Sequence, residues 1–326
     1  MSEVFFHELG IPEPDVNLGV GSGSHGQQTA ALLVAMEQAF TQAAPERVVV
    51  YGDVNSTLAA ALTCAKLLIP VAHVEAGLRS FDVTMPEEIN RRVTDLLSDP
   101  LFVTAPEGEQ NLAREGISGE RVVFVGNPMI DTLLEHLDRF DPEPVKAALG
   151  VDAPYAVATL HRPANVDTPE GASALIAAVR AASERLPLVL PLHPRGRARL
   201  ETAGLGEVPD LHVVDPLGYI DFLSLVRGAA VVITDSGGIQ EETTVLDVPC
   251  LTLRPTTERP ITLTAGTNRL VTPAGLADAL DGALAGAQKR IGAGPPGWDG
   301  HAGERIAAHL LALRGETPVL EGLAEA

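Results

Sequence analysis

The sequence is poor in cysteine, in basic residues and in long apolar runs, and each shortage excludes a class of protein. Its two cysteines, Cys64 and Cys250, lie in apolar surroundings without the spacing of a metal or redox site, so we expect free buried thiols. The 23 basic residues against 43 acidic ones give a formal net charge of −20, which makes nucleic acids and anionic membranes poor partners. No apolar run reaches the length that crosses a membrane. These observations predict a cytoplasmic protein.

Two cofactor signatures are also missing. The glycine-rich stretch at residues 19–24 precedes a helix but does not follow a buried strand, so the G-x-G-x-x-G signature of nicotinamide-binding proteins is absent. His161 and His193 are candidate metal ligands, but no His-x-x-x-His spacing or Cys/His cluster supports that role. We therefore expect neither a metal nor a redox cofactor.

The length and the alternation of apolar segments predict an α/β protein of two domains. The 326 residues suffice for two cores, since 45% are hydrophobic although only 4% are aromatic. Strands are predicted at residues 47–51, 71–74, 101–104, 122–125, 155–160, 188–192, 211–214, 229–233 and 250–253, and helices at 56–68, 87–98, 107–115, 129–137, 173–185, 219–227 and 304–313. A proline-rich stretch at residues 141–144 separates the two series. The pattern predicts two doubly wound, Rossmann-like domains facing a cleft, residues 1–128 and 129–303, with a helix near 304–316 returning to the first.

One segment is especially informative, Thr234-Asp-Ser-Gly-Gly-Ile-Gln-Glu-Glu242, which joins a buried strand to a helix. We expect Ser236 to cap that helix, and Gly237 and Gly238 to let a ligand approach the backbone closely. Free N–H groups and the positive end of the helix dipole make such a turn an anion site. A glycine-rich turn is often only a tight connection, so the flanking residues decide its interpretation.

Charged residues around this segment favour a nucleotide sugar as the ligand. Glu241 and Glu242 lie one turn inside the helix, where their carboxylates suit hydrogen bonds from sugar hydroxyls. Arg254 and Arg259 follow the next strand and suit phosphate groups. A ligand that carries both phosphates and a polyol is a nucleotide sugar.

Three carboxylates of the first domain follow strand ends or open a helix, as the residues around Ser236 do in the second domain. Asp53 and Glu75 follow the first two strands, and Glu87 opens a helix directly after Pro86. Because ligands of open α/β sheets bind beyond the carboxyl ends of the strands, we expect the three to converge on one wall of the cleft. Taken singly, Asp53 is also typical of a turn or helix cap, and Glu87 of an ordinary complement to a helix dipole.

Basic side chains follow the first two strands of the second domain. His161 and Arg162 come after the first strand, and His193 and Arg195 after the second. A lone histidine at a strand end is more often a structural donor than a catalyst. Two such groups at neighbouring strand ends, facing the Ser236 helix, predict a pyrophosphate pocket.

Several short motifs occur together over nearly the whole chain, from about residue 5 to residue 305. They are Gly52-Asp53, His73-Val-Glu75-Ala-Gly-Leu-Arg79, Pro86-Glu87-Glu88-Ile-Asn90-Arg91, Gly126-Asn127, Leu160-His161-Arg162, Asp215-Pro-Leu-Gly-Tyr219, Thr234 to Glu242, Thr257-Glu-Arg259-Pro and Gly266-Thr-Asn268. In this combination the chain closely resembles one family, the non-hydrolysing UDP-N-acetylglucosamine 2-epimerases, which have the GT-B fold.

The resemblance implies roles for individual positions. It makes Asp53, Glu75 and Glu87 acid/base carboxylates and places His161 beside the UDP phosphates. The other implied contacts are Ser236, Gly237, Gly238, Glu242 and Arg259 with UDP, Leu217 with uracil, Phe222 near that base, and Arg162 and His193 with a regulatory or second substrate molecule. It also implies a cytoplasmic homodimer that uses no cofactor.

The implied reaction interconverts UDP-N-acetylglucosamine and its manno isomer. UDP is eliminated anti to give a 2-acetamidoglucal, and UDP adds back as the proton returns on the opposite face. The sequence leaves four alternatives open: epimerisation of another UDP-sugar such as a diacetamido uronic acid, a hydrolysing sialic-acid-type epimerase, a glycosyltransferase, and an inactive UDP-sugar-binding protein.

The chain departs from the family's pattern at its start. The family opens with a βαβ unit whose first turn reads Gly-Thr-Arg-Pro-Glu, followed by a Gly-Gln-His loop, and neither is present. We expect that about 30–45 residues are missing before Met1. The sheet edge at residues 48–51 would then be exposed, and the epimerase activity of this form should be low.

Overall fold

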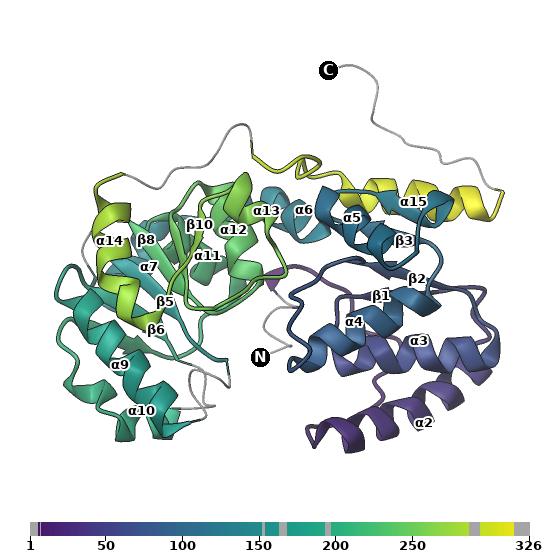
Figure 1. The fold of residues 1–326 in the computed structure, drawn as a ribbon, viewed down its shortest axis with the longest axis horizontal. Coiled ribbons are helices and arrows are strands. Elements are labelled where there is room, and N and C mark those ends of the chain that lie inside the picture. Colours follow the sequence, from purple (N-terminus) through teal and green to yellow (C-terminus); the bar gives the residue numbers. More distant parts are fainter. Residues whose placement is uncertain are drawn as a thin grey trace. The chain divides into compact units, whose positions relative to one another are not determined.

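The computed structural model describes residues 6, 8–151, 154–162, 168–192, 197–286 and 294–315, so His193 lies outside the described residues. The chain divides into two compact units, each built on one parallel sheet (Figure 1). The four-stranded unit comprises Val16–Leu134 with Pro296–Ala326, and the six-stranded unit comprises Met1–Asp15 with Glu135–Pro295. Within the described ranges, no helix is long and apolar enough to cross a membrane.

In the four-stranded unit the strands follow one another across the sheet in the order β1-β2-β3-β4. The elements are α2 (His25–Ala43), β1 (Val48–Tyr51), α3 (Asn55–Leu67), β2 (Val71–Val74), α4 (Pro86–Leu97), β3 (Leu101–Val103), α5 (Pro106–Arg114), η1 (Gly119–Arg121), β4 (Val122–Phe124), α6 (Pro128–Glu135) and α15 (Ala302–Leu313). Short apolar runs alternate with helical segments because parallel neighbours can be joined only by a crossover.

Alternate side chains of this sheet face two different layers of helices. Val50 and Val71 belong to a buried cluster with residues of α2 and α3. Phe102, on the other face, packs in a cluster with Ile306 of α15 and meets the ring of His309 edge-on, with the ring centroids 5.5 Å apart. The late helix of the sequence therefore completes the core of this unit.

In the six-stranded unit the sheet order is β10-β9-β8-β5-β6-β7, with every pair parallel. The elements are η2 (Leu137–Arg139), α7 (Pro142–Leu149), β5 (Ala156–Thr159), α9 (Pro169–Ser183), β6 (Leu188–Pro191), α10 (Arg197–Thr202), η3 (Leu205–Glu207), β7 (Leu211–Val214), α11 (Tyr219–Arg227), β8 (Val231–Thr234), α12 (Gly238–Leu246), β9 (Cys250–Thr252), α13 (Ile261–Thr264), β10 (Asn268–Leu270), η4 (Pro273–Gly275) and α14 (Leu276–Leu284). The main apolar cluster joins Leu190 and Ile233 of the sheet to Ile176 of α9 and Leu280 of α14.

The chain reverses its direction across this sheet between β5 and β8. The unit's first strand, β5, thus lies in the interior, as in a doubly wound sheet, and the reversal creates a topological switch point. Open α/β sheets bind their ligands beside the carboxyl ends of the strands at such a point. The four described strands of the other sheet show no reversal.

The proline-rich stretch at residues 141–144, which separates the two predicted series of strands and helices, begins α7. Asp141 caps this helix by accepting a hydrogen bond from the Glu143 amide at 3.1 Å, and Pro142 occupies the first turn. Proline is favoured at that position because its missing N–H is not needed there. The prolines therefore mark a helix start.

Both cysteines are free and buried, which confirms the prediction of unpaired thiols. Burial raises the pKa of Cys64 and of Cys250 to about 11. In the part of the chain that the structure describes, no group of three or more His, Cys, Asp or Glu residues is arranged to hold a metal ion.

Candidate active site

Two loops leave the six-stranded sheet side by side at its switch point. Thr159 and Thr234 end the neighbouring strands β5 and β8, and their hydroxyls hydrogen-bond at 2.6 Å. The Asp235 amide then donates to the Thr159 carbonyl at 3.1 Å, so the pairing continues one residue beyond the strands. His161 and Ser236 therefore emerge from adjacent strand ends.

The buried carboxylate of Asp235 organises the loop that carries His161. It accepts hydrogen bonds from the amides of His161, at 3.1 and 3.2 Å, and of Arg162, at 3.0 Å. It also lies 3.1 Å from Nδ1 of the His161 ring, whose side chain is 52% exposed. Because Nδ1 faces Asp235, Nε2 is the ring nitrogen left for a ligand.

The start of α12 differs from the predicted one. The helix begins at Gly238, with Gly237 at the N-cap position, and no side chain caps it. The prediction that Ser236 caps the helix is therefore wrong, because Ser236 lies one residue too early. The Ser236 amide instead donates a hydrogen bond to the Thr234 hydroxyl oxygen at 2.9 Å, and the Ser236 carbonyl accepts one from the Gln240 side chain at 2.9 Å.

Gly237 lies against a buried ion-pair cluster. A Cβ at Gly237 would come within 2.5 Å of Oε1 of Glu258 and 2.8 Å of Nη1 of Arg259. Arg259 contacts Glu258 at 2.8 Å and Glu241 at 2.7 Å, and Arg254 contacts Glu258 at 2.6 Å. Burial would raise the pKa of Glu258, but Arg259 and Arg254 outweigh it and hold the pKa well below its usual value. The cluster fixes Arg259 beside the start of α12.

Glu242, one turn inside α12, has a pKa near neutral pH. Burial, together with the negative charge of Glu241, raises its pKa from 4.5 to about 7, and Arg259 offsets part of this rise. A carboxyl with such a pKa changes charge easily when hydrogen-bond donors approach. It can therefore respond to a ligand that carries hydroxyl groups.

Leu217 and Phe222 lie at the turn from β7 into α11, Leu217 before the helix and Phe222 in its first turn. Glu8 caps α11: its carboxylate accepts bonds from the amides of Tyr219, at 2.7 Å, and Ile220, at 3.4 Å. A carboxylate is favoured there by the helix dipole. The sequence did not indicate this contact, because it joins residues 211 positions apart.

In the four-stranded unit, Asp53 and Glu75 follow the ends of β1 and β2, and Glu87 lies in the first turn of α4. Glu75 has a left-handed backbone with φ of +70°, a conformation that costs a residue with a side chain roughly 1–3 kcal/mol. The turn after it is fixed, since the Gly77 amide donates to the buried Asp95 at 3.1 Å. A left-handed residue directly after a strand changes the direction of its side chain, here that of Glu75.

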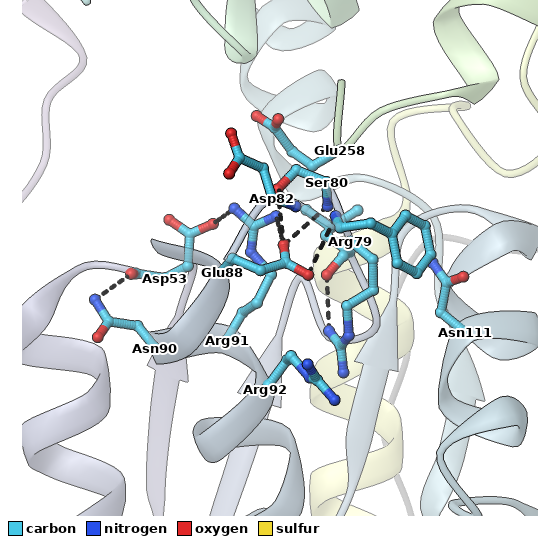
Figure 2. Close-up of polar contacts among 12 residues, drawn as sticks. Asp53, Arg79, Ser80, Asp82, Glu88, Asn90, Arg91, Arg92, Asn111 and Glu258 are labelled. Carbon is cyan, nitrogen blue, oxygen red and sulfur yellow. Dashed lines mark hydrogen bonds and ion pairs between the residues drawn. The ribbon is translucent and has the colours of Figure 1, made fainter. Parts of the chain in front are cut away.

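One face of α4 is tied to Asp53 (Figure 2). The Asn90 side chain donates to the Asp53 carbonyl at 2.8 Å, and Nη2 of Arg91 lies 2.5 Å from Oδ2 of Asp53. Glu87 precedes these two residues by three and four positions, so it lies on the same helical face. The structure therefore brings Asp53 and the Glu87 face of α4 together.

A second network, in which His73, Asp95 and Arg79 are buried, supports the ends of β1 and β2. His73 donates from Nε2 to the Gly52 carbonyl at 2.9 Å, and its Nδ1 lies 2.7 Å from Asp95. Asp95 also contacts Arg79 at 2.7 Å, and Arg79 continues to Glu115 at 2.7 Å. The hydrogen bonds of Arg79 keep the pKa of Glu115 below its usual value despite partial burial.

The candidate residues thus form two groups, one in each unit, and their catalytic and binding roles stay predictions. Sequence reasoning did not single out four supporting residues: Asp235, Glu258, Asn90 and Arg91. The spacing of Asn90 and Arg91 from Glu87 was a usable signal. For Asp235 and Glu258 the sequence offered no such signal, although both lie inside motifs whose other residues were selected as candidates.

Comparisons of sequence point in one direction. A family model described as UDP-N-acetylglucosamine 2-epimerase matches residues 1–311. A UDP-N-acetylglucosamine 2-epimerase of Methanocaldococcus jannaschii is 42% identical over 281 residues, 83% of this chain and 77% of that protein. A UDP-2,3-diacetamido-2,3-dideoxy-D-glucuronate 2-epimerase of Pseudomonas aeruginosa is 43% identical over 274 residues, 83% of this chain and 76% of that protein.

Solved structures agree with these likenesses. The M. jannaschii UDP-GlcNAc 2-epimerase, crystallised in complex with UDP-GlcNAc and UDP, matches with a TM-score of 0.89 at 41% identity, covering 96% of this chain and 88% of that chain. The S. aureus MnaA–UDP structure matches with a TM-score of 0.85 at 29% identity, covering 95% of this chain and 86% of that chain. The predicted α/β fold of the GT-B type is confirmed.

Proposed function

Because the chain belongs to the UDP-N-acetylglucosamine 2-epimerase family, we propose that it interconverts UDP-N-acetylglucosamine and UDP-N-acetylmannosamine. The observation that carries the proposal is the switch-point site, where His161 and Arg162, held by Asp235, lie beside the start of α12. The ligands of two relatives support it, since one was crystallised with UDP-GlcNAc and UDP and the other with UDP.

We infer that the UDP pyrophosphate binds at the N-terminus of α12. The amides of Gly237 and Gly238 and the helix dipole favour an anion there, and Arg259 is held beside Gly237. Glu242 accepts hydrogen bonds from ribose hydroxyls in this proposal. The remaining proposed contacts are Ser236 and His161 with UDP, Leu217 and Phe222 with uracil, and Arg162 and His193 with a second substrate molecule.

The proposed chemistry is an elimination followed by a re-addition. A carboxylate takes the proton of C2, the C2–H electron pair forms the C1=C2 bond, and the C1–O pair leaves with UDP. The proton returns to C2 on the opposite face while UDP re-forms the C1–O bond. Asp53, Glu75 and Glu87 supply the acid/base groups, a contribution of about 10²- to 10⁴-fold, and the donors around α12 stabilise the departing pyrophosphate.

A second substrate has specific support. The P. aeruginosa relative, whose substrate is a UDP-diacetamido uronic acid, is as similar to this chain as the M. jannaschii enzyme, at 43% and 42% identity. The two sugars share UDP and the C2 acetamido group, so the same acid/base residues suit both. The preference between them rests on groups at C3 and C6 of the sugar.

Incubation of the protein in deuterated water with each UDP-sugar tests these proposals. Epimerisation through a glucal places deuterium at C2 of both isomers, and the preferred sugar is the one with the higher kcat/KM. Release of free sugar would instead indicate hydrolysis. Bound but unchanged UDP-sugar, without exchange at C2, would overturn the proposed function.

Three further expectations stay predictions. They are the homodimer, the cytoplasmic location and the domain limits at residues 128 and 303. Light scattering of the purified protein checks the homodimer.

A further inference from the structure

Arg91 lies at the centre of the contacts in Figure 2, and its guanidinium is shared by two carboxylates. Nη2 lies 2.5 Å from Oδ2 of Asp53, and Nη1 lies 3.2 Å from Oε2 of Glu88. The side chain of Arg91 is 2% exposed and that of Glu88 also 2%, whereas that of Asp53 is 24% exposed. Arg91 thus joins a buried carboxylate to one that solvent, and hence a substrate, can reach.

We propose that Arg91 is the positioning residue that holds the Asp53 carboxylate oriented to accept the C2 proton of the substrate. The inference rests on the proposed epimerase function and goes beyond it. The role applies to Arg91 because a guanidinium has only donors, so the Asp53 oxygen that faces it must be an acceptor.

The surrounding contacts leave Asp53 little freedom. Asn90 donates to the Asp53 carbonyl at 2.8 Å, and His73 donates to the carbonyl of the preceding Gly52 at 2.9 Å. The backbone is fixed by these two bonds and one carboxylate oxygen by Arg91. No contact between another described residue and the second oxygen, Oδ1, is present, so Oδ1 is the atom that accepts the proton.

In the step that this arrangement serves, Oδ1 of Asp53 forms a bond to the C2 proton. The C2–H pair becomes the second bond between C1 and C2, and the C1–O bond breaks with its pair on the UDP oxygen. The carboxylate becomes a carboxylic acid that still faces Arg91 through Oδ2. A second acid/base group on the opposite face then gives C2 its new proton as UDP re-forms the C1–O bond. Asp53 releases its proton to solvent and the second group takes one up, so atoms and charge balance over the cycle.

A purely structural role for Arg91 is the alternative. Glu88 also accepts bonds from the amide and the hydroxyl of Ser80, both at 2.9 Å, and from the amide of Phe81 at 3.3 Å. Arg91 neutralises this buried carboxylate, and its removal would leave the charge uncompensated, which is strongly destabilising. A loss of activity in a single variant therefore does not distinguish the two roles.

A double variant separates them. In Arg91→Met with Glu88→Gln, the buried charge and its partner disappear together, and the new amide still accepts the bonds from Ser80. We expect the melting temperature to return close to that of the wild type, while kcat stays about 10²- to 10⁴-fold lower and KM and the Kd of UDP change less than threefold. Recovery of kcat to within threefold of the wild type would overturn the proposal.

Arg91→Lys provides the second test in case the double variant does not fold. Lysine keeps the charge but lacks the fork that holds two carboxylates at once. We expect a folded protein whose kcat is about 10- to 100-fold low with an unchanged Kd for UDP, and wild-type kcat in this variant would overturn the positioning role. The wild-type protein in the same assay tests the proposed function itself: its failure to epimerise either UDP-sugar would overturn both.

Discussion

Asp235 holds His161 at both its backbone and its ring. The fully buried carboxylate accepts a hydrogen bond from the His161 amide at 3.1 Å. It also lies 3.1 Å from Nδ1 of the same residue. A buried carboxylate on Nδ1 selects the orientation of the imidazole ring, as in the triad of serine hydrolases. His161 is therefore presented to a ligand through Nε2 by a residue that a ligand need not touch.

The first prediction concerns this pair. Asp235→Asn keeps one acceptor oxygen for the amides but removes the charge, so kcat should fall by about 100-fold or more with little loss of melting temperature. His161→Asn and the double variant complete a cycle measured by kcat. If the two residues act as a unit, the double variant loses no more than the worse single variant. Additive losses would show that Asp235 acts independently of His161.

The second prediction concerns the pH dependence of stability at Glu242. Its pKa is raised from 4.5 to about 7, so the folded state keeps a proton that the unfolded state has already lost between these values. Stability therefore falls as the pH rises through this window, by roughly 3 kcal/mol in total. Glu242→Gln should remove the effect, since the amide does not titrate.

Urea unfolding of the wild type and of Glu242→Gln at pH 5 and pH 8 measures this difference. The groups near Glu242 are Glu241, Arg259 and Tyr219, and all of them are present in both proteins. Only the Glu242 titration therefore separates the two profiles. A stability difference between the two proteins that is the same at both pH values would contradict the prediction.

The fold was predictable where a segment's own pattern is strong. The apolar runs of β2 and β7 and the amphipathic α11 begin and end where the sequence indicates. The short β10 and α13 were not identified, because three or four residues carry too little periodicity and depend on their neighbours for burial. The strand order, with its switch point, is a tertiary property that no local pattern contains.

The candidate site was likewise predictable in part. Residues at strand ends, such as Asp53 and His161, follow from the rule that ligands bind at the carboxyl edge of a parallel sheet. The contacts that hold them do not follow: Arg91 reaches Asp53 across 38 positions, and Asp235 reaches His161 across 74. Such pairs become visible only when the helices are packed on the sheet. The supporting residues were therefore missed although the residues they support were found.

The third prediction concerns the glycine at the start of α12. In Gly237→Ala the new Cβ would lie 2.5 Å from Glu258 and 2.8 Å from Arg259, so the ion pair between them must move. We expect the affinity for UDP to fall about 10- to 100-fold, as about 1.4–2.7 kcal/mol of charge-assisted bonding is lost. Calorimetric titration with UDP measures the change.

Gly282→Ala in α14 is the matched control for that variant. It also replaces a glycine of the six-stranded unit, but its Cβ would meet nothing within 4 Å. This change should leave the affinity for UDP unaltered and stabilise the helix by about 0.5–1 kcal/mol. Equal affinities of both variants and the wild type would show that the Gly237 turn does not contact the ligand.

The last prediction separates two adjacent glutamates of α4. Glu88 is buried and holds Ser80 and Arg91, whereas Glu87, half-buried on the helical face that holds Asp53, makes none of these bonds. Glu87→Gln should therefore reduce kcat about 10²- to 10⁴-fold while the melting temperature and the Kd of UDP remain unchanged. Glu88→Gln should instead leave kcat nearly unchanged and lower the melting temperature by several degrees, because a buried charge pair is broken. Turnover and thermal unfolding of the two variants, measured side by side, check both expectations. A parallel loss of UDP affinity and kcat in Glu87→Gln would assign that residue to binding, and unchanged kcat would remove it from the acid/base set.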